Sequence, residues 1–173
     1  MDVLVQALLA LALVPALLGW LERWQAATAA LSVLLLAVVA ALGLTSDATA
    51  TWDVGRTLAL GLALLLAVSG GGPITTLVFA AVDRQDHSSD VVEAEDVLRG
   101  GAWIGALERA GVFATLAAGW PDGLAIVLGL KALGRYPELR NGDNPGTAER
   151  FIIGTFTSVL WAAGCAGVAV LVT

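Results

Sequence analysis

Six charged side chains lie within or at the edges of apolar segments in the second half of the chain. They are Glu108, Arg109, Lys131, Arg135, Glu149 and Arg150. An ionised side chain at the centre of a bilayer costs at least about 2.5 kcal/mol on insertion scales, so each of these charges needs a partner, a route to water or a function. Lysine and arginine bind carboxylate and phosphate groups, and a nearby glutamate can orient them. The chemistry that these residue types could perform is recognition of an anion.

The segments that carry these charges are apolar enough to cross a membrane. Of the 173 residues, 58% are hydrophobic and 14% are charged, and the mean hydropathy is +0.83. A membrane-spanning helix needs about 17–25 apolar residues, and the sequence offers up to six such segments, at 3–20, 27–44, 57–82, 102–120, 123–136 and 151–172, of which the fifth is short and the third long. We therefore predict an all-α fold, a polytopic membrane helical bundle of about six transmembrane helices. It would form a single transmembrane domain, 1–173, with three-helix halves at 1–82 and 102–173.

The remaining composition excludes several classes of site. The single cysteine, Cys165, and the single histidine, His87, rule out an internal disulfide and a cysteine or histidine metal cluster. The net charge of −6 comes with an acidic connection at 83–96 and no basic patch, so we expect no nucleic-acid partner. The acidic connection matches no calcium-loop pattern. No metal and no cofactor are predicted.

The distribution of arginine and lysine predicts the orientation of the bundle. The first, third and fifth connections and the helix ends beside them contain Arg23, Arg84, Arg99, Arg135, Arg140 and Arg150, whereas the opposite side contains Arg56 alone. Positive residues concentrate on the cytoplasmic side of membrane proteins. Those three connections are therefore predicted to be cytoplasmic, and both termini to lie outside.

This orientation would place the six charges at similar depth on the cytoplasmic side. Glu108 would lie about 10 Å along the fourth helix at 1.5 Å per residue. Lys131 and Arg135, four residues apart, share one face of the fifth helix, and the turn at 120–122 makes the two helices antiparallel neighbours. We predict that Glu108 pairs with a cation of the fifth helix, first of all Lys131. Three interpretations remain open: solvated helix ends, a purely structural ion pair, and an anion-binding pocket open to the cytoplasm.

A second feature is the sequence SGGGP at 69–73, within the third apolar segment. Glycine is a poor helix former, and proline is suited to the first position of a helix. We therefore predict a Gly-Pro break in the third helix. A half-helix beginning at Pro73 would direct free amides at an anion, which makes Gly72 and Thr75 candidate ligand-binding residues. The alternatives are a kink and a close helix contact made possible by glycine.

Three motifs carry a resemblance to a known family. They are GxxIGxLER at Gly101, Ile104, Gly105, Leu107, Glu108 and Arg109; KxxxR at Lys131 and Arg135; and AExFxIGTxxS at Ala148, Glu149, Phe151, Ile153, Gly154, Thr155 and Ser158. Over about residues 100–160 the chain resembles the C-terminal membrane region of an uncharacterised family of bacterial multi-pass membrane proteins. The sequence departs from the family pattern at Ala132, where serine is expected, and at Arg150, where an aromatic residue is expected. The resemblance implies a protein of the bacterial inner membrane and implies no activity.

Two functional hypotheses follow from these residues. In the first, the protein binds, and could translocate, an anionic small molecule or a lipid headgroup at a cytoplasm-facing pocket. Lys131 and Arg135 would bind the anion with help from Arg109 and Arg150, and Glu108 and Glu149 would orient the cations. In the second, the protein is a non-enzymatic membrane subunit or assembly factor whose charges are structural, docked to a partner membrane protein or to a second copy. A membrane enzyme is less favoured, because no nucleophile or metal set accompanies Glu108.

Overall fold

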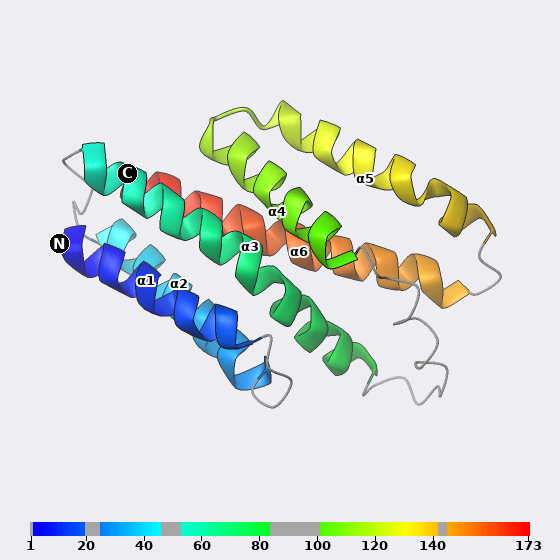
Figure 1. The fold of residues 1–173 in the computed structure, drawn as a ribbon, viewed down its shortest axis with the longest axis horizontal. Coiled ribbons are helices and arrows are strands. Elements are labelled where there is room, and N and C mark those ends of the chain that lie inside the picture. Colours follow the sequence, from blue (N-terminus) through cyan, green and yellow to red (C-terminus); the bar gives the residue numbers. More distant parts are fainter. Residues whose placement is uncertain (1, 20–24, 46–52, 84–100, 142–144) are drawn as a thin grey trace.

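The structure, a computed structural model, describes residues 2–19, 25–45, 53–83, 101–141 and 145–173, and all of its regular elements are α-helices (Figure 1). The six helices are α1 (Asp2–Leu18), α2 (Gln25–Thr45), α3 (Asp53–Asp83), α4 (Gly101–Ala117), α5 (Asp122–Asn141) and α6 (Pro145–Val172). The predicted all-α class is confirmed. Each helix matches one predicted apolar segment, but α5 and α6 extend further than predicted at the connection between them. The acidic connection and the arginines at 84 and 99 lie outside the described residues.

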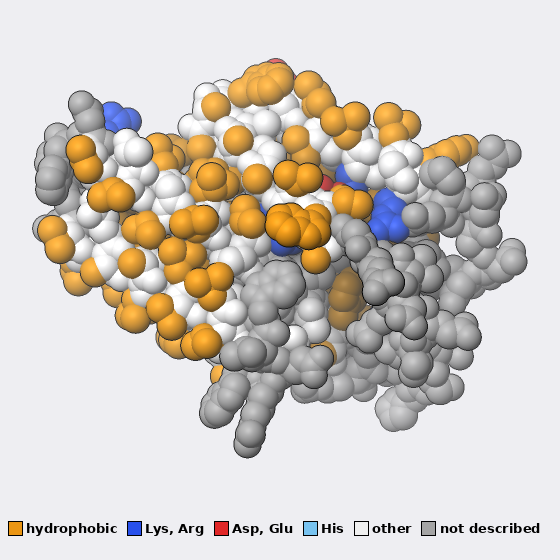
Figure 2. Space-filling view, in the orientation of Figure 1, with side chains coloured by type: hydrophobic (Ala, Val, Ile, Leu, Met, Phe, Trp, Pro, Cys, Tyr) orange, Lys and Arg blue, Asp and Glu red, His pale blue; other side chains and the backbone are white. Residues whose placement is uncertain are grey.

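Many of the fully buried positions are alanines, and many large apolar side chains face outward. Fully buried positions include Ala12, Ala63, Ala67, Ala162, Ala166 and Ala169, whereas Leu17, Leu34, Leu65, Leu107 and Leu160 are more than half exposed. Lipid tails are as apolar as leucine, so transmembrane helices gain little by burying leucine against one another. Small residues instead let the helix backbones approach closely, and this close packing favours helix association. Apolar side chains also dominate the described surface in Figure 2. This distribution supports a membrane-embedded protein.

Three of the helices are long and apolar enough to cross a membrane. Their spans are Gln25–Leu44 in α2, Val54–Val82 in α3 and Ala148–Val172 in α6, and a shorter apolar helix covers Val3–Leu18. The closest helix packing is between α3 and α6, which form the centre of the bundle. Helices α1 and α2 lie on one side of this pair, and α4 and α5 lie on the other (Figure 1).

Successive helices run in alternating directions. The ends of α1, α3 and α5 and the starts of α2, α4 and α6 lie toward one side of the molecule, and both chain termini lie toward the other (Figure 1). This arrangement agrees with an even number of membrane crossings. The described helix ends that flank the predicted arginine-rich connections lie on that common side, whereas Arg23, Arg84 and Arg99 themselves lie outside the described residues.

The predicted Gly-Pro break in the third helix is wrong. Helix α3 is continuous through the three glycines, with Pro73 inside it. Pro73 has no N–H to donate to the carbonyl four residues earlier, and the ribbon of α3 is bent rather than straight (Figure 1). The hydroxyls of Ser69, Thr75 and Thr76 donate to the carbonyls four residues before them, at 2.7, 2.7 and 3.2 Å. The proline therefore bends a helix and does not begin one, and Gly72 and Thr75 present no free helix terminus to an anion.

The glycines serve close packing instead. A Cβ atom at Gly70 would lie 2.8 Å from Cζ2 of Trp161 in α6. The indole Nε1–H of Trp161 donates to the carbonyl of Leu66 at 3.2 Å. A carbonyl has two lone pairs, so Leu66 can accept this bond in addition to its helical one. The glycine run thus lets a large side chain lie against the backbone of α3.

Candidate functional site

The site begins with the turn that folds α5 back along α4. Gly119 has a positive φ of 68°, which only glycine adopts without strain. The amide of Trp120 donates to the carbonyl of Thr115 at 2.8 Å, and the amide of Gly119 donates to Leu116 at 3.0 Å, the pattern of a Schellman helix end. The close approach continues along the hairpin, since a Cβ at Gly111 would lie 3.1 Å from Val127. The predicted antiparallel neighbours are confirmed.

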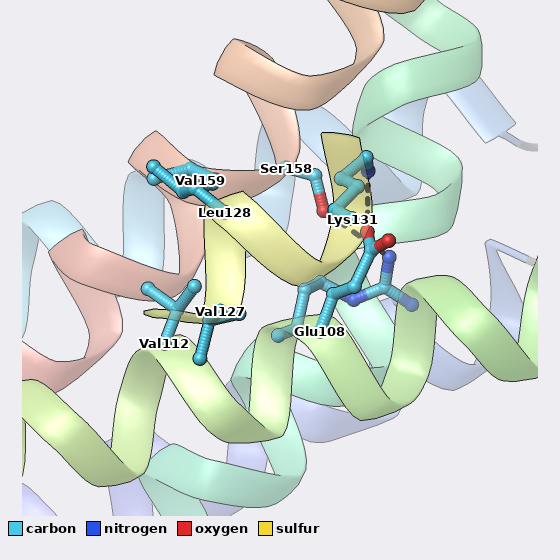
Figure 3. A pocket seen from close by; sticks show the side chains of 8 residues that line it. Glu108, Val112, Val127, Leu128, Lys131, Ser158 and Val159 are labelled. Atoms are coloured by element: carbon cyan, nitrogen blue, oxygen red, sulfur yellow. Dashed lines mark hydrogen bonds and ion pairs between the residues drawn. The ribbon is translucent and has the colours of Figure 1, made fainter. Parts of the chain in front are cut away.

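Glu108 and Lys131 form an ion pair between these two helices. Lys131 Nζ donates to Glu108 Oε2, and Figure 3 shows the two side chains pointing toward one another from α4 and α5. The lysine and glutamate side chains are 16% and 14% exposed. The predicted pairing is confirmed, and it neutralises a carboxylate that would otherwise lie among apolar residues.

The ammonium of Lys131 has a second contact. It lies 5.7 Å from the centroid of the Phe151 ring of α6, within the range of a cation–π attraction. Lys131 is therefore held at the junction of α4, α5 and α6.

Arg109, the next residue on α4, is held in another way. It is 5% exposed, its Nε donates to the carbonyl of Val68 at 3.1 Å, and its Nη1 donates to Ser158 Oγ at 3.4 Å. Within the described parts of the chain, no carboxylate lies at ion-pairing distance from the guanidinium. Arg109 therefore joins α4 to α3 and α6 through neutral acceptors and keeps its positive charge.

Two glycines make room for this arginine. A Cβ at Gly71 of α3 would lie 2.6 Å from Nε and closer still to Cδ, and a Cβ at Gly105, one turn before Arg109, would lie 3.1 Å from Nη1. Real Cβ contacts do not reach 2.6 Å, so any other residue at 71 would displace the guanidinium. Gly71, the second glycine of the run, thus leaves the space that the Arg109 side chain occupies.

The charged residues line a narrow crevice between α4, α5 and α6. Its walls are Glu108, Arg109, Val112, Val127, Leu128, Lys131, Ser158 and Val159 (Figure 3). The space that these side chains outline totals about 210 Å³, part of it open solvent, and it contains no separate volume as large as a water molecule. In Figure 2 basic and acidic side chains meet in a patch beside α4 and α5. The crevice combines cations with an apolar wall and is closed in this conformation.

The other predicted site residues lie around the crevice or away from it. Arg135 is half-buried one turn beyond Lys131 on the same face of α5, and Glu149 is exposed. The guanidinium of Arg150 lies 5.8 Å from the ring centroid of Phe79 in α3. Neither Gly72 nor Thr75 lines the crevice, and the Thr75 methyl group faces Gly154 of α6. The structure therefore brings together Glu108, Arg109 and Lys131 from the predicted set.

Two hydroxyls of α6 were not predicted as site residues: Ser158 lines the crevice, and Thr155 lies one turn before it on the same helix. Ser158 is buried and accepts from Arg109. Thr155 lies on the same face, three residues before Ser158 and four after Phe151, and its Oγ1 is buried without a hydrogen-bond partner among the described residues. The sequence signal that could have indicated these two residues is their spacing from Phe151, because positions 151, 155 and 158 share one helix face.

Comparison of the chain with protein-family models, with curated proteins and with solved structures finds no match. The function must therefore be inferred from the crevice itself.

Proposed function

We propose that the protein is a six-span protein of the bacterial inner membrane that binds an anionic ligand, a lipid headgroup or a small molecule, at the crevice between α4, α5 and α6. In this proposal both termini lie outside, and the crevice lies toward the cytoplasmic side. Lys131 binds the anion together with Arg109, and Arg135 adds positive charge one turn away.

The observation that carries the proposal is the imbalance of charge in the crevice. One carboxylate, Glu108, faces two cations, Arg109 and Lys131, which leaves a net charge of +1 among the lining residues. The carboxylate is engaged by Lys131, and Arg109 donates only to a carbonyl and a hydroxyl. An uncompensated positive charge in a medium of low dielectric attracts an anion strongly.

The apolar part of the crevice favours an amphiphilic ligand. The wall beside the charged groups is formed by Val112, Val127, Leu128 and Val159. A lipid could therefore place its headgroup against the charged residues and its acyl chain against the apolar wall. This combination is typical of ligand sites, in which a mostly apolar lining surrounds a few polar groups.

The alternative hypothesis, a structural subunit, is supported by the hydrogen bonds of Arg109. They fix three helices to one another, as expected for a charge whose role is to hold the bundle together. The two hypotheses differ in what they predict for Lys131, because a structural pair needs no external anion.

The deciding experiment measures lipid binding by the intact protein. Native mass spectrometry of wild type and Lys131→Met, in mixtures of anionic phosphatidylglycerol and zwitterionic phosphatidylcholine, should show a preference for the anionic lipid that the variant loses. Arg56→Met is the matched control, since Arg56 is an exposed cation on α3 outside the crevice. It should bind like the wild type. Equal preference in wild type and Lys131→Met would overturn the proposal and leave the structural role.

A further inference from the structure

We infer that the ion pair of Lys131 and Glu108 is a latch on a sideways entrance between α5 and α6, and that the phosphate of a membrane lipid opens it by replacing Glu108 on Lys131. This inference rests on the proposed anion site and names its ligand class and its regulation. The structure is the latched state, because the crevice walls leave no water-sized space.

Helix α5 is the element free to move. Among the described helices it packs closely against α4 alone, whereas α4 also packs against α3 and α6. Figure 1 shows α5 at the edge of the bundle beside α4. At the crevice, Leu128 and Lys131 of α5 line the side that faces α6, and the Lys131 ammonium lies over the Phe151 ring. Releasing the ion pair therefore loosens α5 without disturbing the central pair of helices.

The surface beside the entrance suits an acyl chain. Next to Leu128, α5 exposes the small residues Ala125, Gly129 and Ala132, and a Cβ at Gly129 would meet open space. On α6 the exposed side chains of Ile152 and Phe156 follow Val159 around the helix. An exposed apolar surface on α5 and α6 thus lies beside the charged end of the crevice.

Polar groups inside the entrance fit a phosphate. Arg109 and Ser158 meet there. Thr155, one turn before Ser158 on α6, has a buried Oγ1 without a hydrogen-bond partner among the described residues. A hydroxyl donates to a phosphate oxygen, and the guanidinium matches phosphate geometry. The lysine keeps its contact with Phe151 when it exchanges one anion for another, and the released Glu108 remains next to the positive charge of Arg109. The exchange is a competition between two anions for one ammonium.

The competition predicts opposite effects for the two partners of the latch. Glu108→Gln removes the competing charge and should raise the affinity for phosphatidylglycerol about fivefold, the factor expected for a weak ion pair. Lys131→Met should lower it to the level of phosphatidylcholine. Glu108→Asp, which keeps the charge on a shorter side chain, should raise the affinity about twofold and provides the test if Glu108→Gln does not fold. Native mass spectrometry and titration in nanodiscs measure each affinity.

The same measurements distinguish the possible failures. If Lys131→Met loses phosphatidylglycerol while both Glu108 variants bind it no better than wild type, the latch is wrong and the anion site stands. If Lys131→Met keeps the preference, the anion site and the latch both fail.

The sideways entrance has its own test. Gly129→Leu adds a large side chain to the exposed surface of α5 beside Leu128 and should lower phosphatidylglycerol binding at least threefold, whereas Gly61→Leu, at an equally open position on α3, should not. Inorganic phosphate added to detergent-solubilised protein should compete weakly and equally in both variants. Unchanged lipid binding in Gly129→Leu, or displacement of the lipid by millimolar inorganic phosphate, would overturn a lipid ligand that enters from the bilayer.

Discussion

Replacing Gly71 by alanine tests the role of the glycine run directly. The new Cβ would lie 2.6 Å from Nε of Arg109, so the guanidinium must move away from the carbonyl of Val68. Overpacking of this kind costs about 1–3 kcal/mol, and loss of a hydrogen bond from a charged donor costs about 1.5–3 kcal/mol. The gain in helix propensity from glycine to alanine is about 1 kcal/mol. We expect Gly71→Ala to lower the free energy of unfolding by about 2 kcal/mol or more, since the two costs act on one side chain and need not add fully.

The matched control is Gly61→Ala on the same helix. Gly61 is exposed, and a Cβ there would meet nothing within 4 Å, so this variant should be as stable as wild type or up to about 1 kcal/mol more stable. Far-UV circular dichroism during titration of micelles with sodium dodecyl sulfate measures both. For a chain of this size the difference corresponds to a melting point about 4–8 °C lower in Gly71→Ala.

Two results would refute this reasoning. One is equal stability of the alanine variants at positions 71 and 61. The other is an unchanged cost of Gly71→Ala in an Arg109→Ala background, because the clash requires the arginine side chain.

Three further predictions concern the hydrogen bond of Trp161, the ion pair of Lys131 and Glu108, and the orientation of the chain in the membrane. Trp161→Phe removes the hydrogen bond to α3 and should lower the free energy of unfolding by about 1–2 kcal/mol in the same titration. Lys131→Met and Glu108→Gln should each cost about 1–3 kcal/mol, less than a fully buried pair, and the double variant should cost less than either single one because no charge is left alone. A cysteine at Ser88, in a Cys165→Ala background, should resist membrane-impermeant thiol reagents in intact cells, as the arginine distribution predicts for the cytoplasmic side.

Each of these has an outcome that contradicts it. Trp103 is 77% exposed, so Trp103→Phe should change stability little, and an equal effect at 103 and 161 would argue against the hydrogen bond. A double variant at 108 and 131 that costs as much as both single variants together would show that the two residues do not interact. Labelling at position 88 would reverse the orientation.

The pairing of Glu108 could be predicted because it depends on local features. A short turn fixes two helices as antiparallel neighbours, and 1.5 Å per residue then places their residues at equal depth. The structure has both the turn and the pair.

The role of the glycine run could not be predicted in the same way. Glycine permits both an interruption of a helix and a close approach, and the sequence does not say which atom approaches. Here the approaching groups are Trp161 and Arg109, which are 91 and 38 positions away from the glycines at 70 and 71 that receive them. A tryptophan inside an apolar span, away from the interface, was the one available signal, because its N–H needs an acceptor there.

The two cations of the crevice are held by different contacts, and this difference decides which of them can be tested for ligand binding by substitution. Arg109 donates hydrogen bonds to a backbone carbonyl and to Ser158, and its side chain occupies space that glycines leave open. Substitution of Arg109 would therefore disturb three helices and would say little about ligand binding. Lys131 is bound to one carboxylate at the edge of the bundle and keeps 16% of its side chain exposed. An ammonium on a flexible chain can turn from one anion to another without moving the backbone. Of the two cations, therefore, only Lys131 is expected to give a variant that folds but loses its lipid preference. Arg109 attracts the anion by its positive charge, from a position that its hydrogen bonds fix.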